Sequence, residues 1–243
     1  MNDTKFNAKF LDIKGNVITN EKITINVNGK DYTRTTNENG EISYPINLEQ
    51  GKYPITVTNP VSKEKSTIYV TVLPSIIENK DVIMFYKNGS RYVVRLVGLD
   101  GKVVGKGEKV VFNINGVFYT RETNENGYAS LSINLDPKTY VITAEYNKCK
   151  VSNNIIVKPT LTASNLTKKY GVSEAFTAKL VDGNGKPLVG ETITFNINGV
   201  FYERTTDNSG TARLNINLMA GKYIITSMYS NGATISNTVT ITG

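Results

Sequence analysis

The chain has 243 residues, and its 28 Lys and Arg against 21 Asp and Glu give a formal net charge of +7. It contains no histidine, no tryptophan and a single cysteine, Cys149. The lack of an imidazole excludes Ser–His–Asp and Cys–His catalysis, and the same composition excludes zinc sites of His and Cys ligands and a disulfide within the chain.

The charge is spread evenly along the sequence. Lysines and acidic residues are interspersed and no basic run occurs, whereas nucleic-acid-binding proteins gather basic residues on one face or helix. We therefore expect no nucleic-acid partner and interpret the charge as an aid to solubility with a mild attraction to anionic surfaces. No run of about 18 apolar residues occurs, so we expect no membrane insertion by this segment. Met1 leads into a polar segment and not a signal peptide, and we expect a piece of a longer exported protein.

A fourteen-residue phrase occurs three times. It reads VNGKDYTRTTNENG from Val27, INGVFYTRETNENG from Ile114 and INGVFYERTTDNSG from Ile197. These starts are 87 and 83 residues apart, which exceeds the roughly 20–50 residues of solenoid repeats and suits a small domain duplicated in tandem. We therefore predict three domains, residues 1–75, 76–159 and 160–243, with boundaries near Pro74 and Pro159.

The first copy begins at Phe6–Phe10, which matches Phe176–Leu180 of the third copy. The strand that precedes this segment in the third copy is missing, so we expect the first domain to be frayed or differently capped. Its last strand, Ile68–Val72, runs almost directly into the second copy, and Ile155–Val157 runs as directly into the third. Short joints that contain proline predict a semi-rigid rod.

The third copy shows the pattern of one domain most fully. Apolar residues such as Phe176, Ala178 and Leu180 alternate with polar ones, which is the period of a half-buried strand. The dipeptide Asn198-Gly199 indicates a tight hairpin turn. The predicted strands are Asn165–Tyr170, Phe176–Leu180, Ile193–Ile197, Phe201–Thr206, Leu214–Leu218, Tyr223–Tyr229 and Ile235–Ile241. Seven short strands without helical periodicity predict an all-β Greek-key sandwich of the immunoglobulin type, present three times.

Each copy has a tyrosine just after a turn, at Tyr53, Tyr140 and Tyr223. This is the place of the tyrosine corner in such sandwiches, where the hydroxyl bonds to the upstream backbone. We expect these tyrosines to be structural and not to bind a ligand.

The segments DGNGKP, FNINGVFY, TDNSG, LNINL, GKYIIT and SNTVTI of the third copy resemble the bacterial-type Ig-like repeats of surface proteins. They are most similar to the repeats of adhesin-like proteins of methanogenic archaea. The resemblance covers essentially the full chain apart from the missing first strand. It implies an exported, wall-associated protein in which stacked Ig-like domains form a stalk, sometimes with adhesive copies. It leaves the ligand open, because function lies in sites and not in the fold.

The three copies share an arginine after the hairpin, at Arg34, Arg121 and Arg204. On a rod these residues would form a ladder of guanidinium groups able to bind carboxylates or phosphates in bidentate fashion. The alternative is surface pairing with Glu122, Glu203 or Glu38, which contributes little.

Two copies also share aromatic residues past the hairpin, namely Phe118, Tyr119, Phe201 and Tyr202. A strand alternates its faces, so one ring of each pair points away from the core. An exposed ring is a contact point for a sugar or a protein partner. The alternative is packing between domains or cover by an edge strand. The first copy has Lys30-Asp31-Tyr32 here, so the phenylalanine is not required for folding.

We interpret the remaining polar features as structural. The turns at Asp182 and Asp207 lack the bidentate acid of a calcium loop, so no metal site or cofactor is predicted. Asn153 and Asn237 fall in phase with inward residues, and we expect ordinary hydrogen-bonded amides and not isopeptide cross-links, because no suitable lysine recurs across the copies. Cys149 is expected to be an incidental surface or half-buried residue between two strands, with an intermolecular disulfide as the alternative.

These features predict a non-enzymatic, extracellular segment at the cell surface or in the cell wall. Tandem Ig-like domains would provide spacing and weak, multivalent cell adhesion. The rival hypothesis is a dedicated module that recognises a wall or partner-cell polysaccharide or protein through its hairpin aromatics. The expected partners are a glycan or protein of another cell and neighbouring domains of a longer parent chain. No paired carboxylates, base or nucleophile recurs in an arrangement that would form a catalytic cleft.

Overall fold

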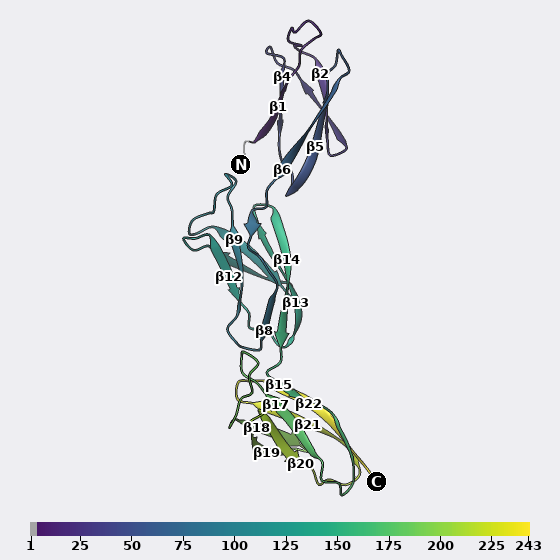
Figure 1. The fold of residues 1–243 in the computed structure, drawn as a ribbon, viewed down its shortest axis with the longest axis vertical. Coiled ribbons are helices and arrows are strands. Elements are labelled where there is room, and N and C mark those ends of the chain that lie inside the picture. Colours follow the sequence, from purple (N-terminus) through teal and green to yellow (C-terminus); the bar gives the residue numbers. More distant parts are fainter. Residues whose placement is uncertain (1–3) are drawn as a thin grey trace.

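The computed structural model describes residues 4–243, and its elements are β-strands. Three domains follow one another along the long axis of the molecule (Figure 1). Each has its own hydrophobic core between two sheets. The prediction of an all-β rod of tandem immunoglobulin-like sandwiches is thereby confirmed. Within the described residues, no helix has the length and apolar character needed to cross a membrane.

The first domain has one sheet of two strands and one of four. The smaller sheet pairs β1 (Lys5–Lys9) with β4 (Glu41–Pro45). The larger sheet has the order β3 (Lys30–Thr35), β2 (Lys22–Val27), β5 (Gly51–Thr58) and β6 (Lys65–Val72).

The second and third domains have sheets of three and five strands. In the second domain the three-stranded sheet has the order β12 (Tyr128–Ser132), β9 (Arg91–Leu96), β7 (Ile76–Ile77). Its five-stranded sheet has the order β11 (Val117–Glu122), β10 (Lys109–Ile114), β13 (Lys138–Tyr146), β14 (Cys149–Lys158), β8 (Val82–Phe85). In the third domain the three-stranded sheet has the order β15 (Leu161–Ala163), β17 (Ala175–Leu180), β20 (Thr211–Asn215). Its five-stranded sheet has the order β16 (Leu166–Lys169), β22 (Thr234–Thr242), β21 (Gly221–Tyr229), β18 (Thr192–Ile197), β19 (Val200–Thr205).

The first strand of the two complete domains is split between their sheets. β15 pairs antiparallel with β17, and β16 then pairs in parallel with β22. β7 and β8 repeat this arrangement against β9 and β14. The sequence-based prediction of one strand over Asn165–Tyr170 was therefore incomplete, because it missed the half that precedes the crossing. The described residues of the first domain contain no counterpart of either half.

Alternation along the strands builds the cores. Phe176, Ala178 and Leu180 face inward and are buried, as their spacing predicted. Phe176 meets Phe195 of the facing sheet edge to face, with ring centroids 5.8 Å apart and an interplanar angle of 90°. Such T-shaped contacts suit the quadrupoles of the two rings. The second domain repeats the contact between Tyr92 and Phe112, at 5.7 Å and 84°.

Cys149 differs from its prediction as a residue between strands. It begins β14, pairs with Tyr146 of β13, and is only 5% exposed. Its thiol donates to the side-chain oxygen of Gln50 in the first domain, at 3.2 Å. The burial follows from strand alternation, because Cys149 shares its face with inward residues of β14, and from the neighbouring domain that lies over this end of the sandwich.

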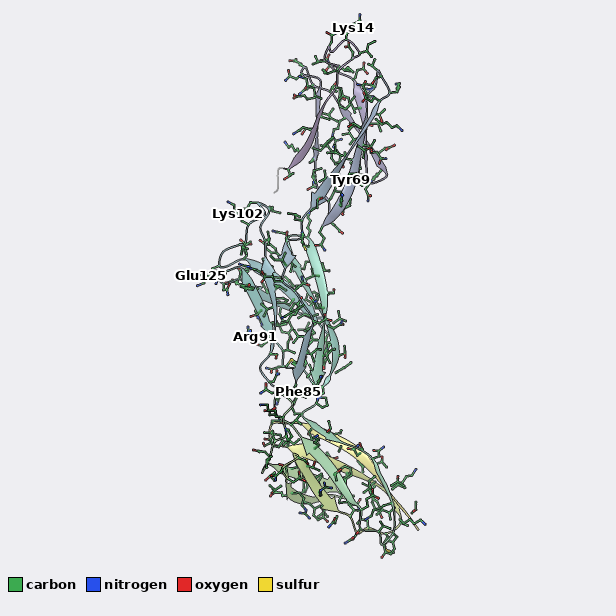
Figure 2. All side chains as sticks on the ribbon, in the orientation of Figure 1. Lys14, Tyr69, Phe85, Arg91, Lys102 and Glu125 are labelled. Atoms are coloured by element: carbon green, nitrogen blue, oxygen red, sulfur yellow. The ribbon has the colours of Figure 1, made fainter. Side chains whose placement is uncertain are left out.

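The joint between the second and third domains is made by residues at the end of β8. Figure 2 shows Phe85 at this joint. Lys87 donates to the carbonyl of Asn231 at 2.7 Å, and the side-chain amide of Asn88 donates to the carbonyl of Gly183 at 3.1 Å. Tyr86 packs against the cores of both domains. The two domains are thus tied by hydrogen bonds and by a shared apolar contact.

Candidate binding surface

The hairpin aromatics lie on edge strands, with their two rings on opposite faces. β11 and β19 each end the order of a five-stranded sheet. Phe118 and Phe201 point away from the core and are 69% and 62% exposed. Tyr119 and Tyr202 are half-buried and pack against the cores. The structure thus separates the aromatic pairs into an outward phenylalanine and an inward tyrosine.

Strand register explains this separation. Tyr119 lies opposite the buried Phe112 of β10, so its neighbour Phe118 lies opposite Asn113 on the outer face. The third domain has the same register, with Phe201 opposite Asn196. In the first domain the outward position holds Asp31, which accepts a hydrogen bond from Asn26.

Further apolar residues accompany each phenylalanine on the outer face of its sheet. Strand alternation puts Val111 and Val141 on this face in the second domain, and Ile224 takes the place of Val141 in the third. All three are exposed. We call these faces the outer aromatic surfaces, Phe118 with Val111 and Val141, and Phe201 with Ile224.

The three arginines are held against their own domains. The Nη1 groups of Arg34, Arg121 and Arg204 donate to the carbonyls of the preceding residues at 2.9, 2.8 and 2.7 Å. Each guanidinium also lies over a tyrosine ring, at 5.2 to 5.9 Å from the centroid. Ion pairs of the described residues join Arg95 to Glu78, Lys150 to Glu145 and Arg213 to Asp207, and none involves these three arginines. Stacking on tyrosine, and not pairing with glutamate, is what the structure shows for them.

The tyrosines that follow a turn bond back to the upstream chain. The hydroxyl of Tyr140 donates to the carbonyl of Asp136 at 2.8 Å, and that of Tyr223 donates to Met219 at 2.9 Å. The bond from Tyr53 to Gln50 is longer, at 3.5 Å. Burial, together with the charge of Asp136, raises the pKa of Tyr140. These contacts leave the hydroxyls engaged within their own domains.

The sequence did not predict a polar cluster that lies where the first strand crosses from one sheet to the other. Asn153 accepts from the hydroxyl of Tyr92 at 2.6 Å, and its amide donates to Asp81 at 3.3 Å. Asp81 also accepts from the backbone amide of Asn154, at 2.8 Å. The Asn154 amides, followed by that of Asn153, lower the pKa of Asp81 below its usual range. The sequence predicted that the Asn153 side chain is hydrogen-bonded, and it is. Its partner Asp81 could not be predicted, because Asp81 lies 73 residues from Asn154 in the sequence and no local pattern links them.

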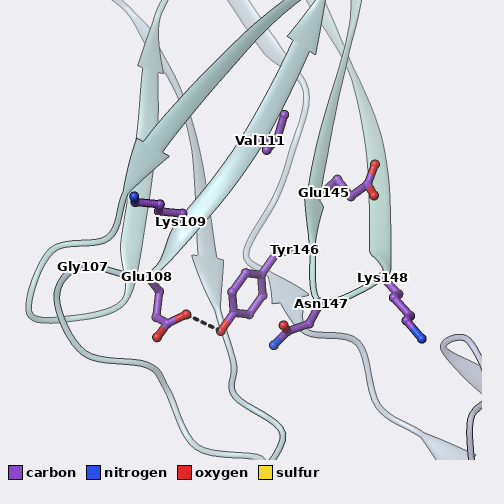
Figure 3. Close-up of a pocket in the computed structure, with 8 residues that line it drawn as sticks. All are labelled: Gly107, Glu108, Lys109, Val111, Glu145, Tyr146, Asn147 and Lys148. Carbon is purple, nitrogen blue, oxygen red and sulfur yellow. Dashed lines mark hydrogen bonds between the residues drawn. The ribbon is translucent and has the colours of Figure 1, made fainter. Parts of the chain in front are cut away.

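A hollow of about 610 Å³ opens at the end of the second domain (Figure 3). In it the hydroxyl of Tyr146 donates to Glu108 at 3.1 Å. Burial, and then this bond, raises the pKa of Tyr146. The third domain repeats the bond between Tyr229 and Glu191, at 2.9 Å. Because the contact belongs to the repeat, it closes the sandwich in both domains and gives the hollow no individual ligand chemistry.

The aspartate turns satisfy their carboxylates internally. Asp182 accepts from the backbone amides of Asn184 and Lys186 at 2.8 Å, and these bonds lower its pKa. Asp207 accepts from the amide and the hydroxyl of Ser209 at 2.8 and 2.6 Å. Among the described residues no group of three or more His, Cys, Asp or Glu side chains is arranged to hold a metal ion.

No family model matches the chain, and no curated protein matches it. Among solved structures, the I9–I11 tandem of titin is similar over 98% of this chain and 93% of its own, with 14% identity and a TM-score of 0.36. A 1.5-MDa bacterial ice-binding adhesin is similar over 93% and 88%, with 17% identity and a TM-score of 0.24. A Ca²⁺-stabilised, ice-binding adhesin of an Antarctic bacterium is similar over 99% and 70%, with 16% identity and a TM-score of 0.25. The likeness is to tandem Ig-like domains, and at these values it carries no argument about ligand or location.

Proposed function

We propose that this chain is a tension-bearing spacer of an extracellular, cell-surface protein, without catalytic activity and similar to the repeats of archaeal adhesin-like proteins. The proposal is supported by the arrangement of the first and last strands in the complete domains. Val82–Phe85 of β8 runs parallel to Ile155–Lys158 of β14, and Leu166–Lys169 of β16 runs parallel to Val239–Thr242 of β22. The chain enters each of these domains through the short half-strand β7 or β15, continues into the first member of the pair, and leaves through the second.

Tension along the rod would load these pairs in shear. The domains follow one another end to end (Figure 1), so pulling on the chain ends draws two parallel, hydrogen-bonded neighbours past one another. The evenly spaced bonds of a parallel ladder then share the load and do not open one at a time. The first domain, whose described residues have no strand parallel to β6, lacks this protection and provides an internal comparison.

Single-molecule pulling of the 243-residue protein tests this proposal. We expect two unfolding events at high force and one at low force, the last belonging to the first domain. The amide of Tyr86 donates to Lys158, so by alternation the amide of Val82 faces β14 and that of Ile83 does not. Val82→Pro should therefore weaken one high-force event, and the control Ile83→Pro should weaken it much less. Three events of equal, low force would contradict the proposal.

A second candidate function is recognition of a wall or partner-cell polysaccharide or protein by the outer aromatic surfaces. It is favoured by the exposure of Phe118 and Phe201 and by their recurrence in successive domains, which suits weak contacts multiplied by avidity. The tandem domains would then act both as a spacer and as an adhesive surface.

Binding of the labelled protein to wall polymers and to cells, across a salt series, tests this second function. Saturable binding that the Phe118→Ala/Phe201→Ala variant loses, and that the matched variant Tyr170→Ala keeps, would support it; Tyr170 is similarly exposed. Binding that disappears in modest salt and is the same in both variants as in the wild type would indicate diffuse attraction by the net charge. Absence of binding would leave the spacer function alone.

A further inference from the structure

The second strand of the hairpin forms an open edge in all three domains. β3, β11 and β19 each end the order of the larger sheet of their domain. An open edge presents backbone amides and carbonyls to which a strand of another molecule can be added. On a rod with several such edges, two copies lying side by side could therefore join their sheets.

The hairpin turn determines which backbone groups point toward the open edge. Asn115 and Gly116 form a two-residue turn with φ of 55° and 76°, so Ile114 and Val117 are the hydrogen-bonded pair that closes it. Hydrogen-bonded pairs occur at every second residue of an antiparallel ladder. Thr120 therefore turns its amide and carbonyl away from β10. The same register gives this place to Thr33 in β3 and to Glu203 in β19.

The recurrent arginines bind these outward carbonyls. The Nη1 group of Arg121 donates to the carbonyl of Thr120 at 2.8 Å, and that of Arg204 donates to Glu203 at 2.7 Å. The bond from Arg34 to the outward carbonyl of its own edge strand measures 2.9 Å. Each guanidinium thus lies where the amide of an added strand would donate, near the middle of the edge, and it brings a charge that an arginine of a second copy would repel.

A tyrosine ring holds each guanidinium at the edge. The guanidinium of Arg121 lies over Tyr119 of its own strand, 5.6 Å from the ring centroid, and the third domain repeats this contact at 5.9 Å. Arg34 lies over Tyr44 of β4 in the other sheet, at 5.2 Å. The attraction between a cation and an aromatic face adds to the hydrogen bond. A strand that joins the edge would have to displace both contacts.

The three edges differ in the residues that follow the turn. β11 begins with Val117 and Phe118, which are 49% and 69% exposed, and β19 begins with the same two residue types at the same exposure. β3 has Lys30 and Asp31 in these places. Charged side chains on an edge discourage the addition of a strand, whereas exposed apolar ones favour it. The edges of the second and third domains therefore depend on their arginine more than the edge of the first domain does.

We propose that Arg121 and Arg204 prevent this protein from pairing edge to edge with a second copy of itself. Without the guanidinium, β11 or β19 would pair antiparallel with the same strand of another copy, as a two-fold axis between the copies requires. The apolar residues that follow the turn would become buried in the joined sheet. Arg34 acts in the same way in the first domain, where Lys30 and Asp31 provide further protection.

Analytical ultracentrifugation of the 243-residue protein over a range of concentrations tests the proposal. We expect the wild type to remain a monomer, and the Arg121→Ala/Arg204→Ala variant to shift to dimers and larger species as its concentration rises. The control Lys102→Ala/Lys179→Ala removes two exposed positive charges from the same two domains. It should remain a monomer, which would separate the position of the arginines from their effect on net charge.

Amide hydrogen exchange locates the contact. The amides of Phe118, Thr120 and Phe201 point toward the open edges, so their exchange should slow in the associated variant, while the core strands keep the protection that they have in the wild type. Slowed exchange elsewhere, with these edge amides unchanged, would mean that the copies meet through another surface and would overturn the proposal.

Two further variants separate edge pairing from misfolding. Phe118→Asp/Phe201→Asp, added to the arginine variant, copies Asp31 of the first domain and should restore the monomer, which it could not do for a misfolded chain. Arg34→Ala alone should remain a monomer, because Lys30 and Asp31 still protect β3. The proposal is overturned if the arginine variant stays monomeric at every concentration, or if the aspartates leave its association unchanged.

Discussion

At the scale of single residues, the tyrosines after the turn offer a test with a built-in comparison. Removal of the hydroxyl in Tyr140→Phe or Tyr223→Phe deletes one short hydrogen bond to the backbone and leaves a carbonyl without its partner. We expect the free energy of unfolding of the affected domain to fall by about 1 kcal/mol. Tyr53→Phe should have a smaller effect, because its bond is 3.5 Å long. Urea unfolding, resolved by domain through amide exchange, measures these changes, and an equal loss in all three variants would contradict the expectation.

Tyr92 links the stability of the second domain to alkaline pH. Burial, and then the charge of Asp81, raises the pKa of Tyr92 to about 12, whereas an unfolded tyrosine has a pKa of about 10. Because the folded pKa is the higher of the two, the contribution of this group is complete below about pH 10 and is lost as the pH rises through about 12. Denaturation midpoints measured from about pH 9 upward should decline over this window, and less steeply in Tyr92→Phe. Equal slopes in the two proteins would refute the assignment.

At the scale of elements, the turn that precedes β20 requires glycine at Gly210. Its φ is +75°, and a Cβ there would overlap the carbonyl oxygen of Leu180 and approach Pro187. Gly199, in the hairpin between β18 and β19, has a similar φ of +77° but open space around it. Gly199→Ala should destabilise the third domain by about 1 kcal/mol through its backbone conformation alone.

Gly210→Ala should destabilise the same domain by about 3 kcal/mol or more, since the backbone strain is joined by a clash with main-chain atoms. Thermal unfolding of the two variants side by side separates the two effects. Similar midpoints would show that the turn yields to the added methyl group.

Much of the element order could be predicted because its signals are local. Alternation in Phe176–Leu180 and the pair Asn198-Gly199 each concern neighbouring residues, and they correctly indicate a strand and a turn of positive φ. The split of the first strand could not be predicted, because only three residues form β15 and a short apolar run carries no clear period.

The candidate surface shows the same limit. The sequence indicated that one ring of each aromatic pair faces outward, but only the register of β11 against Phe112 shows that it is Phe118. The burial of Cys149 depends on its pairing in β14 and on Gln50, 99 residues away. The alternation of strand faces can be predicted from neighbouring residues, whereas long-range register and contacts between domains cannot.

At the scale of the whole molecule, the two joints differ in how they hold the rod. The second joint combines the bonds of Lys87 and Asn88 with the packing of Tyr86 against both neighbouring cores. At the first joint, the Cys149 thiol donates to Gln50, and a thiol is a weak donor. Domains held by a shared apolar contact resist bending better than domains joined by a short linker alone, because bending would expose that contact to water.

We therefore expect the second and third domains to tumble as one body and the first to move more independently. Backbone ¹⁵N relaxation, which reports a rotational correlation time for each domain, should give similar values for the second and third domains and a shorter one for the first. Tyr86→Ala with Asn88→Ala should separate the values of the second and third domains, because it removes the apolar contact and one bond that cross the joint. Gln50→Ala, the control at the first joint, should leave them equal. Three different correlation times in the wild-type protein would mean that the domains are joined flexibly. The length of such a stalk would be set by the entropy of its linkers and not by the rigidity of its joints.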